Sequence, residues 1–384
     1  MSYWQTFRHE LTAIFSNPTL LLTVLGGVVF YSFLYPLPYA KQVPREQQVV
    51  VVNLDGSQMS RELERMIDAT PQVELARRAY SLKEAEEIFI TKRMSGIVVI
   101  PEHFYRDLLL GTSPTLSYAG DASYFLIYGT VLEGLAGAGK TLASRVKVNR
   151  LVMSGQALSL ASEQYSAIKL QLRAVFNPTT GYVNYVIPAI FVLILHHTLI
   201  MGAGILGGGQ NEARLKGQSG YWQQVPVLQL VLVRAGLFVG IYWLLCMYYF
   251  GFSFNFYTIP HHAKFFELNL IILPFLLGTS LCGIFLGLII PRRELATLIV
   301  LLSSMPLIFA SGFVWPVETV PDVLTAIIQF IPVVPAIKIF LGINQMGAEL
   351  SDYSATLRQM WVCVALYGTL SLITLFLQRK VASS

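Results

Sequence analysis

The stretch from Tyr182 to Leu206 reads YVNYVIPAIFVLILHHTLIMGAGIL and contains no Asp, Glu, Lys or Arg. A helix of about 20 apolar residues crosses the ~30 Å hydrocarbon core of a bilayer, so this stretch predicts a membrane-spanning helix. Other apolar stretches predict five more spans, at residues 18–35, 225–251, 265–290, 295–314 and 357–377. The sequence therefore predicts an α-helical polytopic membrane protein with six transmembrane helices.

The composition of the whole chain agrees with this fold class. Hydrophobic residues make up 54% of the 384 residues and charged residues only 13%, whereas soluble domains carry about 25% charged residues. The net charge of +5 comes without a long basic run, which argues against a nucleic-acid-binding protein. The sequence has no Cys, His and carboxylate cluster typical of a metal site and no Ser/His/Asp arrangement typical of catalysis.

Most of the charge gathers in one segment. Between residues 39 and 178 lie 30 of the 49 charged residues, although this segment is only a third of the chain. Strands are expected at 49–52, 96–100 and 115–118, and helices at 60–69, 81–93 and 122–176, the last with a break near Gly155. Because strands alternate with helices, residues 39–178 predict an α/β domain with long helices between the first and second spans.

Residues 1–17 predict an amphipathic helix that lies at the membrane interface. Apolar residues including Trp4 recur at helical spacing, with Arg8 and Glu10 on the other side. The first transmembrane helix follows at 18–38. A cleaved signal peptide is the alternative, but the apolar run is longer than a usual signal and an acidic residue stands where its positive region would be. We therefore expect a retained anchor.

Residues 179–384 predict a transmembrane domain of five helices with a re-entrant segment at about 315–344. This segment is apolar, but prolines interrupt it repeatedly. Broken backbone at membrane depth is tolerated where protein or a water-filled cavity satisfies its polar groups. Short re-entrant helices are therefore expected at this point.

The Lys and Arg residues of the short loops predict the orientation. With the amino terminus in the cytoplasm, the short inner segments carry seven basic residues and the short outer segments three. Cytoplasmic loops are enriched in Lys and Arg, so both termini are expected in the cytoplasm and the α/β domain outside it. In a bacterial cell this is a multi-pass protein of the inner membrane with a periplasmic domain.

Residues 134–141, GLAGAGKT, match the G-x-x-x-x-G-K-[ST] pattern of a phosphate-binding loop at every position. That motif works as a loop between a strand and a helix, where backbone N–H groups converge on a phosphate. Here the preceding residues run on into a helical pattern, and the expected orientation places the motif outside, away from ATP. We expect a helix whose small residues allow close packing, and no nucleotide bound by this chain.

Two segments of the second half resemble a known family. The charged turn after the second span reads GGGQNEARLKG at 207–217, and the outer end of the fifth span reads SGFVWPVETVP at 311–321, followed by IPVVP at 331–335. Together these segments are similar to permeases of the ABC-2 type, in the branch of bacterial exporters that has a long external domain. The basic residue that the family usually has a little further on is matched only loosely, by Lys338.

This resemblance implies a non-catalytic permease subunit of an ABC exporter. Two such subunits, identical copies or related sisters, pair in the lipid bilayer. A separate cytosolic ATPase, which binds ATP and Mg²⁺, drives the alternation between inward- and outward-facing states. The expected substrate is hydrophobic or amphipathic and leaves the cytoplasm or the inner membrane. Exporters of this branch often work with a periplasmic membrane-fusion protein.

The charged residues near the inner face have two interpretations. Glu212, Arg214 and Lys216 form either an element that couples the permease to the ATPase or a solvated turn that sets the topology. Arg8 and Glu10 are a second expected ATPase contact.

The re-entrant segment and two residues within the spans are candidates for the substrate route. Arg234 is the only basic residue well inside a span, and it either faces the path or snorkels to the headgroups. His196 and His197 point about 100° apart on a helix, so they do not easily share one metal, and His197 is a candidate for the path. The expected outer gate comprises Gly312, Phe313, Trp315, Pro316, Glu318, Pro321, Pro332 and Pro335.

A second class of protein shares this layout of one span, a large external domain and five spans. It is a membrane-anchored receptor or phage-infection protein, with the external domain as its binding module. The charged inner turn distinguishes the two classes, because a receptor needs no element that docks an ATPase.

Overall fold

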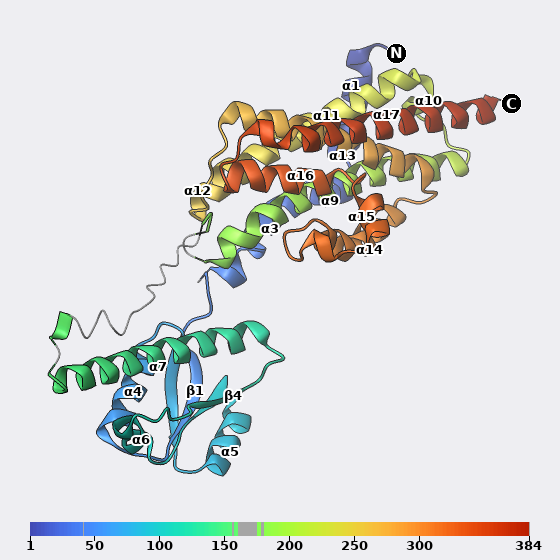
Figure 1. Ribbon diagram of the computed structural model, residues 1–384. Helices are drawn as coiled ribbons and strands as arrows, with labels where there is room; N and C mark the ends of the chain where they lie inside the picture. Colours follow the sequence, from blue (N-terminus) through green and yellow to red (C-terminus); the bar gives the residue numbers. More distant parts are fainter. Residues whose placement is uncertain (41, 156, 160–174, 178–179, 384) are drawn as a thin grey trace. The chain divides into compact units, whose positions relative to one another are not determined.

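The computed structural model describes residues 1–384 except 41, 156, 160–174, 178–179 and 384 (Figure 1). The chain divides into two compact units, which are described separately. The membrane unit comprises residues 1–42 and 174–384, and the α/β unit comprises residues 43–173.

The α/β unit is built around one small sheet. Its elements are β1 (Gln47–Asn53), α4 (Gln58–Asp68), β2 (Val73–Ala79), α5 (Leu82–Lys92), β3 (Gly96–Ile100), α6 (Phe104–Leu110), β4 (Ser117–Gly120) and α7 (Phe125–Met153). The strand order is β2-β1-β3-β4, with β1 parallel to both β2 and β3 and with β4 antiparallel to β3. Parallel neighbours need crossover connections, which α4 and α5 provide.

The four consecutive valines of β1 form the centre of this unit. Each of Val49 to Val52 is at most 1% exposed, and successive side chains point to opposite faces of the sheet. Val49 and Val51 pack with residues of α4 and α7, whereas Val50 and Val52 pack with residues of α5. Because helices cover both faces, the strand is apolar throughout instead of alternating.

The sequence predicts three of the four strands. The strand that it misses is β2, which carries Glu74, Arg77 and Arg78 and has only two fully buried residues at its ends. As an edge strand it pairs on one side only, so it tolerates charge that hides the usual apolar pattern. The helix expected at 122–176 is present as α7 up to Met153, and most of its second half lies outside the described residues.

The membrane unit consists of helices. Among the described residues, five are long and apolar enough to cross a membrane, or up to six if one bent pair counts as a span. The five are Pro18–Tyr39, α9 (Tyr182–Leu215), Val227–Phe256, α13 (Phe265–Ile289) and Leu350–Lys380. The span Pro18–Tyr39 contains α2 (Pro18–Leu21) and α3 (Gly27–Leu34). The span Val227–Phe256 contains α11 (Val227–Met247) and α12 (Phe254–Phe256). The span Leu350–Lys380 contains most of α17 (Ser354–Ser383).

Shorter helices complete the membrane unit. They are α1 (Tyr3–Phe15), α10 (Tyr221–Gln224), α14 (Glu294–Ala310), α15 (Asp322–Ile328) and α16 (Val333–Phe340). The span expected at 295–314 is α14, whose 17 residues measure about 25 Å, less than a hydrocarbon core of ~30 Å. The helix α15 and the segment Val333–Gln345 meet at 92°, where a re-entrant segment is expected.

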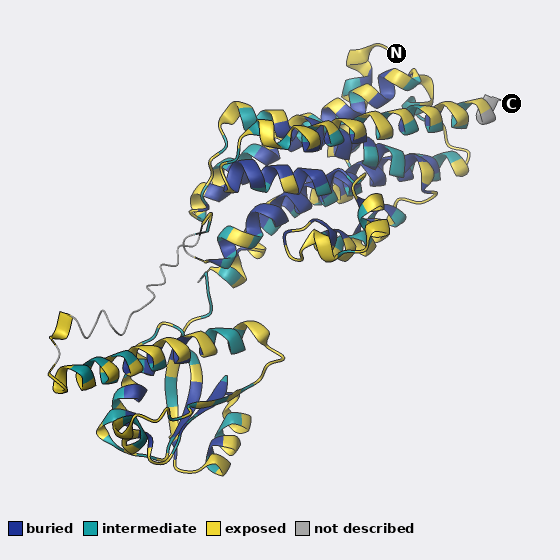
Figure 2. Ribbon diagram, in the orientation of Figure 1, coloured by how far each residue is buried: buried dark blue, intermediate teal, exposed yellow. Residues whose placement is uncertain are grey.

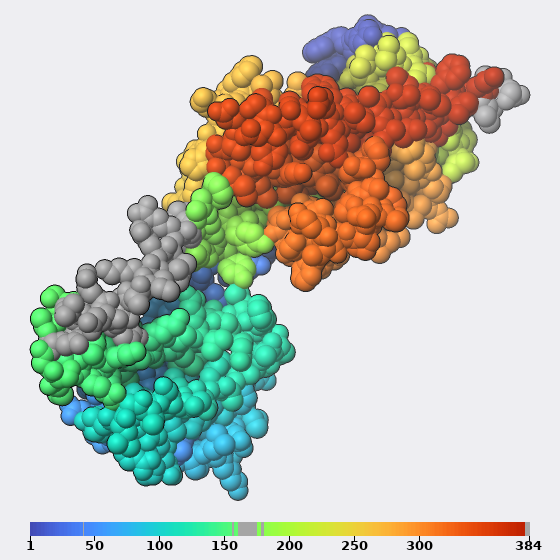
Figure 3. Space-filling model, viewed as in Figure 1, coloured from blue at the N-terminus to red at the C-terminus, as the bar shows by residue number. Residues whose placement is uncertain are grey.

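The helix α9 is the centre of the membrane unit. Nearly every side chain from Ile187 to Gly208 is buried, and α9 packs against α13, α14 and α16. By contrast, α14 and α17 expose large apolar residues along most of their length. Figure 2 colours much of both helices as exposed, and Figure 3 shows the red atoms of α17 at the surface of the membrane unit. In a membrane protein such a surface faces lipid or another chain, so α9 lies inside the bundle and α17 at its outside.

Glycines bring α9 and α13 into close contact. A Cβ atom on Gly207 would stand 2.8 Å from the Cα atom of Gly287, and one on Gly283 would stand 2.9 Å from the Cβ atom of Ala203. Real Cβ atoms do not approach this closely, so small residues are required here. The two helices are therefore packed backbone to backbone near one end of the bundle.

Candidate functional site

The phosphate-loop pattern at 134–141 lies inside the helix α7. Its backbone N–H groups are therefore within a helical hydrogen-bonding ladder and cannot converge on a phosphate. Gly134 lies against β2, since a Cβ atom there would stand 2.9 Å from a methyl carbon of Val73. Gly134 therefore allows close packing, but against the sheet, whereas a Cβ atom on Gly137 or Gly139 would have no neighbour within 4 Å.

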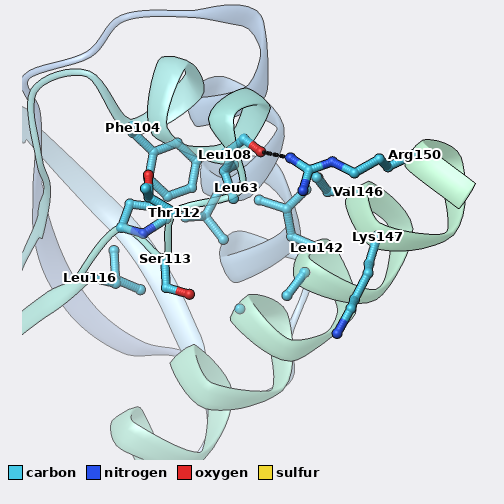
Figure 4. Close-up of a pocket in the computed structure, with 14 residues that line it drawn as sticks. Leu63, Phe104, Leu108, Thr112, Ser113, Leu116, Leu142, Val146, Lys147 and Arg150 are labelled. Atoms are coloured by element: carbon cyan, nitrogen blue, oxygen red, sulfur yellow. Dashed lines mark hydrogen bonds between the residues drawn. The ribbon is translucent and has the colours of Figure 1, made fainter. Parts of the chain in front are cut away.

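A cavity of about 440 Å³ lies under the same helix (Figure 4). Its wall is mainly apolar, with Leu63, Phe104 and Leu142 among the lining residues. Arg150 donates from Nη2 to the carbonyl oxygens of Leu108 and Leu109, each at 2.8 Å. That guanidinium therefore caps the carboxyl end of α6 instead of pointing a free charge into the cavity.

The amino-terminal helix is joined to the interior of the bundle by a buried ion pair. Arg234 of α11 donates from Nε to Oε2 of Glu10 at 2.8 Å and from Nη2 to Oε1 at 2.7 Å. The two side chains are 2% and 0% exposed. Such a bidentate pair has the geometry of the strongest arginine–carboxylate contacts.

Three other residues complete this network. Tyr221 of α10 donates from its hydroxyl to Oε1 of Glu10 at 2.9 Å, and Arg234 donates to Oε1 of Gln210 at 2.8 Å. Burial raises the pKa of the Tyr221 hydroxyl, and the negative charge of Glu10 raises it further. The ring of His9 stacks on Tyr221 with centroids 5.1 Å apart. The network thus holds α1, α9, α10 and α11 together.

The structure separates the two residues of α1 expected to contact an ATPase. Glu10 is fully buried against Arg234, whereas Arg8 is exposed. Arg234, a candidate for the substrate path, has this carboxylate as its partner. The sequence does not predict the pair, although an arginine inside a span is usually paired or faces a cavity.

Glu212, Arg214 and Lys216 lie at the end of α9 and not in a turn that begins at Gly207. The helix continues to Leu215, and Lys216 pairs with Glu212 one turn earlier, at 2.7 Å from Nζ to Oε1. The sequence predicts a turn at this point, but Gly207 packs against the backbone of Gly287 in α13 and the helix continues. With 34 residues α9 is about 51 Å long and extends past a ~30 Å core as one continuous helix, with Pro188 inside it.

Asn211 fixes this end of α9 to α13. Its Nδ2 lies 3.0, 2.6 and 3.1 Å from the carbonyl oxygens of Gly287, Leu288 and Ile290. These carbonyls belong to the last turn of α13, where helical partners are missing. A buried side-chain amide thus completes the end of a neighbouring helix.

The structure does not bring all of the expected gate residues together. Gly312, Glu318 and Pro335 line one cavity of about 460 Å³, which Lys338 also lines. Phe313 is buried, and its carbonyl oxygen accepts a hydrogen bond from the Tyr185 hydroxyl of α9. Of the others, Pro332 is buried near Gly278, and Trp315, Pro316 and Pro321 are exposed.

The two histidines of α9 lie in the middle of the bundle. His196 is 2% exposed, and neither of its ring nitrogens has a hydrogen-bond partner in the described structure. The Nε2 atom of His197 is also without one there, and the two ring centroids are 5.5 Å apart. No group of three or more His, Cys, Asp or Glu side chains that could hold a metal occurs among the described residues.

The long apolar helices, the buried central helix and the charged helix end define a multi-pass membrane protein. The sequence profile described as ABC-2 family transporter protein matches residues 18–373. The chain therefore belongs to the ABC-2 family, whose members are the membrane permeases of ABC transporters and pair with an ABC ATPase subunit. A search among curated proteins finds no match to the chain.

Proposed function

We propose that this chain is the permease subunit of an ABC exporter and moves a hydrophobic or amphipathic substrate outward by alternating access. It works as a pair with a second copy or a sister permease. Its α/β unit lies outside the inner membrane, where a membrane-fusion protein docks, and both termini lie in the cytoplasm. The ATPase partner binds ATP and Mg²⁺.

The observation that carries this proposal is the continuity of α9. One end bears Glu212 and Arg214, and Tyr185 at the other end donates a hydrogen bond to the expected gate at Phe313. Helix α9 is continuous from Tyr182 to Leu215, although Pro188 removes one backbone hydrogen bond a turn away from Tyr185. A continuous helix that reaches from the charged end to the gate is an element that can pass a displacement from one to the other. Movement of an ATPase against the charged end is thereby passed to the gate.

The charged end of α9 is the proposed ATPase contact, together with Arg8 of α1. Glu212 and Lys216 neutralise each other, while Arg214 is partly exposed and has no ion pair in the described structure. Because Glu10 is buried, it contributes by fixing α1 and not by direct contact.

The test is the ATPase activity of the partner subunit in nanodiscs, with and without the permease. The triple variant Glu212→Ala, Arg214→Ala and Lys216→Ala is expected to reduce the stimulation at least about fivefold, the lower end of usual coupling energies. Lys264→Ala is the matched control, since this exposed lysine precedes α13 at the opposite end of the bundle. Full stimulation in the triple variant would contradict the proposed contact.

A second measurement tests the gate. Single cysteines at Phe313 and Val317 are expected to change their reactivity with a water-soluble maleimide when ATP or ADP is bound to the partner. Phe313 is 5% exposed and Val317 is 40% exposed, so an opening movement alters the first more strongly. Constant reactivity at both positions in every nucleotide state would exclude this segment as the gate.

A further inference from the structure

A cavity of about 360 Å³ lies where the ends of α9, α10, α11, α13 and α17 meet. This volume is within the range of ~300–1,000 Å³ usual for small-molecule sites. Figure 1 shows both chain termini at this end of the membrane unit. The cavity is lined by Gly207, Gln210, Asn211, Arg214, Trp222, Gln223, Leu230, Arg234, Leu288, Leu375, Gln378 and Arg379.

The charges around the cavity leave an excess of positive charge. Three arginines line it and no carboxylate does. The nearest acidic residues are already paired, Glu10 with Arg234 and Glu212 with Lys216. Two guanidinium groups, those of Arg214 and Arg379, therefore remain without an ion pair in the described part of the chain.

The available donors match a phosphate group. Arg379 uses Nη2 for the carbonyl oxygen of Trp222 at 2.8 Å, and its other N–H groups are not committed in the described structure. The guanidinium of Arg214 makes no hydrogen bond in the described structure, and the backbone carbonyl of this residue accepts one from Gly217 at 3.0 Å. Two planar guanidinium groups around one cavity are the arrangement that suits a phosphate, because each can donate two parallel hydrogen bonds.

The rest of the lining gives the cavity an amphipathic character. Leu230, Leu288 and Leu375 come from three membrane helices, and the two unpaired arginines come from the ends of α9 and α17. A phospholipid carries its phosphate directly beside the first methylenes of its acyl chains, so one molecule presents both kinds of group. Basic pockets between membrane helices are known to bind anionic headgroups.

We propose that this cavity binds a phosphate ester with net negative charge, presented by an anionic phospholipid headgroup or by a small soluble phosphate. Arg214 and Arg379 hold the phosphate oxygens, and the leucines contact the apolar part of a lipid. The bound group links the ends of α9 and α17 through charge. It is separate from the route for the exported substrate, which involves the cavity at the opposite end of α9.

The experiment uses the full chain purified in a nonionic detergent, without the ATPase, so that its outcome does not depend on the proposed coupling. Phosphatidylglycerol, phosphatidylcholine and glycerol 3-phosphate are titrated in turn, and binding is followed by native mass spectrometry. Phosphatidylglycerol should bind more tightly than phosphatidylcholine, because choline brings a cation next to two guanidinium groups. Arg214→Gln and Arg379→Gln should each weaken binding by about tenfold or more, the value of one charge-assisted contact.

Two variants keep the result decisive. Arg214→Gln removes no hydrogen bond present in the described structure, so loss of binding cannot be assigned to misfolding. Arg8→Gln with Arg292→Gln is the control, because both residues are exposed and neither lines the cavity. Equal binding by Arg214→Gln and the unmodified chain, or equal weakening by the control, would overturn the proposal. Competition by glycerol 3-phosphate would assign the site to a soluble ester, and its failure to compete would assign it to the lipid.

Discussion

Replacing either member of the Glu10–Arg234 pair should destabilise the membrane unit far more than replacing both. Arg234→Met leaves a buried carboxylate without a cation, and Glu10→Leu leaves a buried guanidinium without an anion. Removing one partner of a buried pair costs about 3–5 kcal/mol, because the remaining charge has lost its compensation. Both side chains are at most 2% exposed, so water cannot take the place of the missing partner.

The double variant Glu10→Leu with Arg234→Met removes both charges. Replacing a buried ion pair by apolar residues often leaves stability unchanged. The free energy of unfolding of the double variant should therefore stay within about 2 kcal/mol of that of the unmodified chain. The double-mutant cycle then gives a coupling energy of at least about 4 kcal/mol. The assay is reversible unfolding of the four proteins in mixed micelles, followed by circular dichroism.

An exposed pair provides the comparison. Lys264 and Glu267 lie 3.9 Å apart with side chains 83% and 32% exposed, and their cycle should give at most about 1 kcal/mol. Two results would refute the inference that the ion pair holds α1 in place. One is a loss of under about 1 kcal/mol in unfolding free energy for each single variant at Glu10 and Arg234. The other is a double variant whose loss equals the sum of the two single losses.

Three further predictions follow from the packing and the motif. Gly207→Ala should destabilise the chain by about 1–3 kcal/mol through overlap with the Gly287 backbone, whereas Gly209→Ala, with no neighbour within 4 Å, should be neutral or stabilising in the same unfolding assay. Asn211→Ala should lower the free energy of unfolding by about 1–3 kcal/mol, because the carbonyl groups at the end of α13 lose their donor. Amide hydrogen exchange at that end of α13 should then become faster. Unchanged exchange would argue that Asn211 does not stabilise the end of α13. Lys140→Ala should leave stability within about 0.5 kcal/mol, since this residue is exposed, and ATP binding by the isolated chain should be absent before and after the change.

The membrane helices are the part of the fold that the sequence predicts best. Apolar length is a local property, so the long spans follow directly from runs such as Tyr182–Leu206. The end of α9 is different, because its glycines weaken a helix by local propensity and are retained by contact with α13. The length of α14 and the charged strand β2 likewise depend on neighbours that no local window contains.

In the candidate site too, some features follow from local sequence and others depend on distant neighbours. Arg234 is conspicuous in the sequence because charge inside a span is expensive, but its partner is 224 positions away. Glu10 lies on a short amphipathic helix, where an acidic residue is normally solvated. Only the packing of α1 on α11 shows that this carboxylate is interior.

The separation of Glu10 and Arg234 along the chain determines when α1 can dock during membrane insertion. Arg234 lies 224 positions after Glu10, and at ~5–20 residues per second this stretch takes roughly ten to fifty seconds to translate. During this interval a buried carboxylate would have no counter-charge, so α1 must wait at the water-exposed surface of the membrane. Docking of α1, which is synthesised before α11, is therefore among the later steps of assembly, and it cannot be completed until α11 has been inserted.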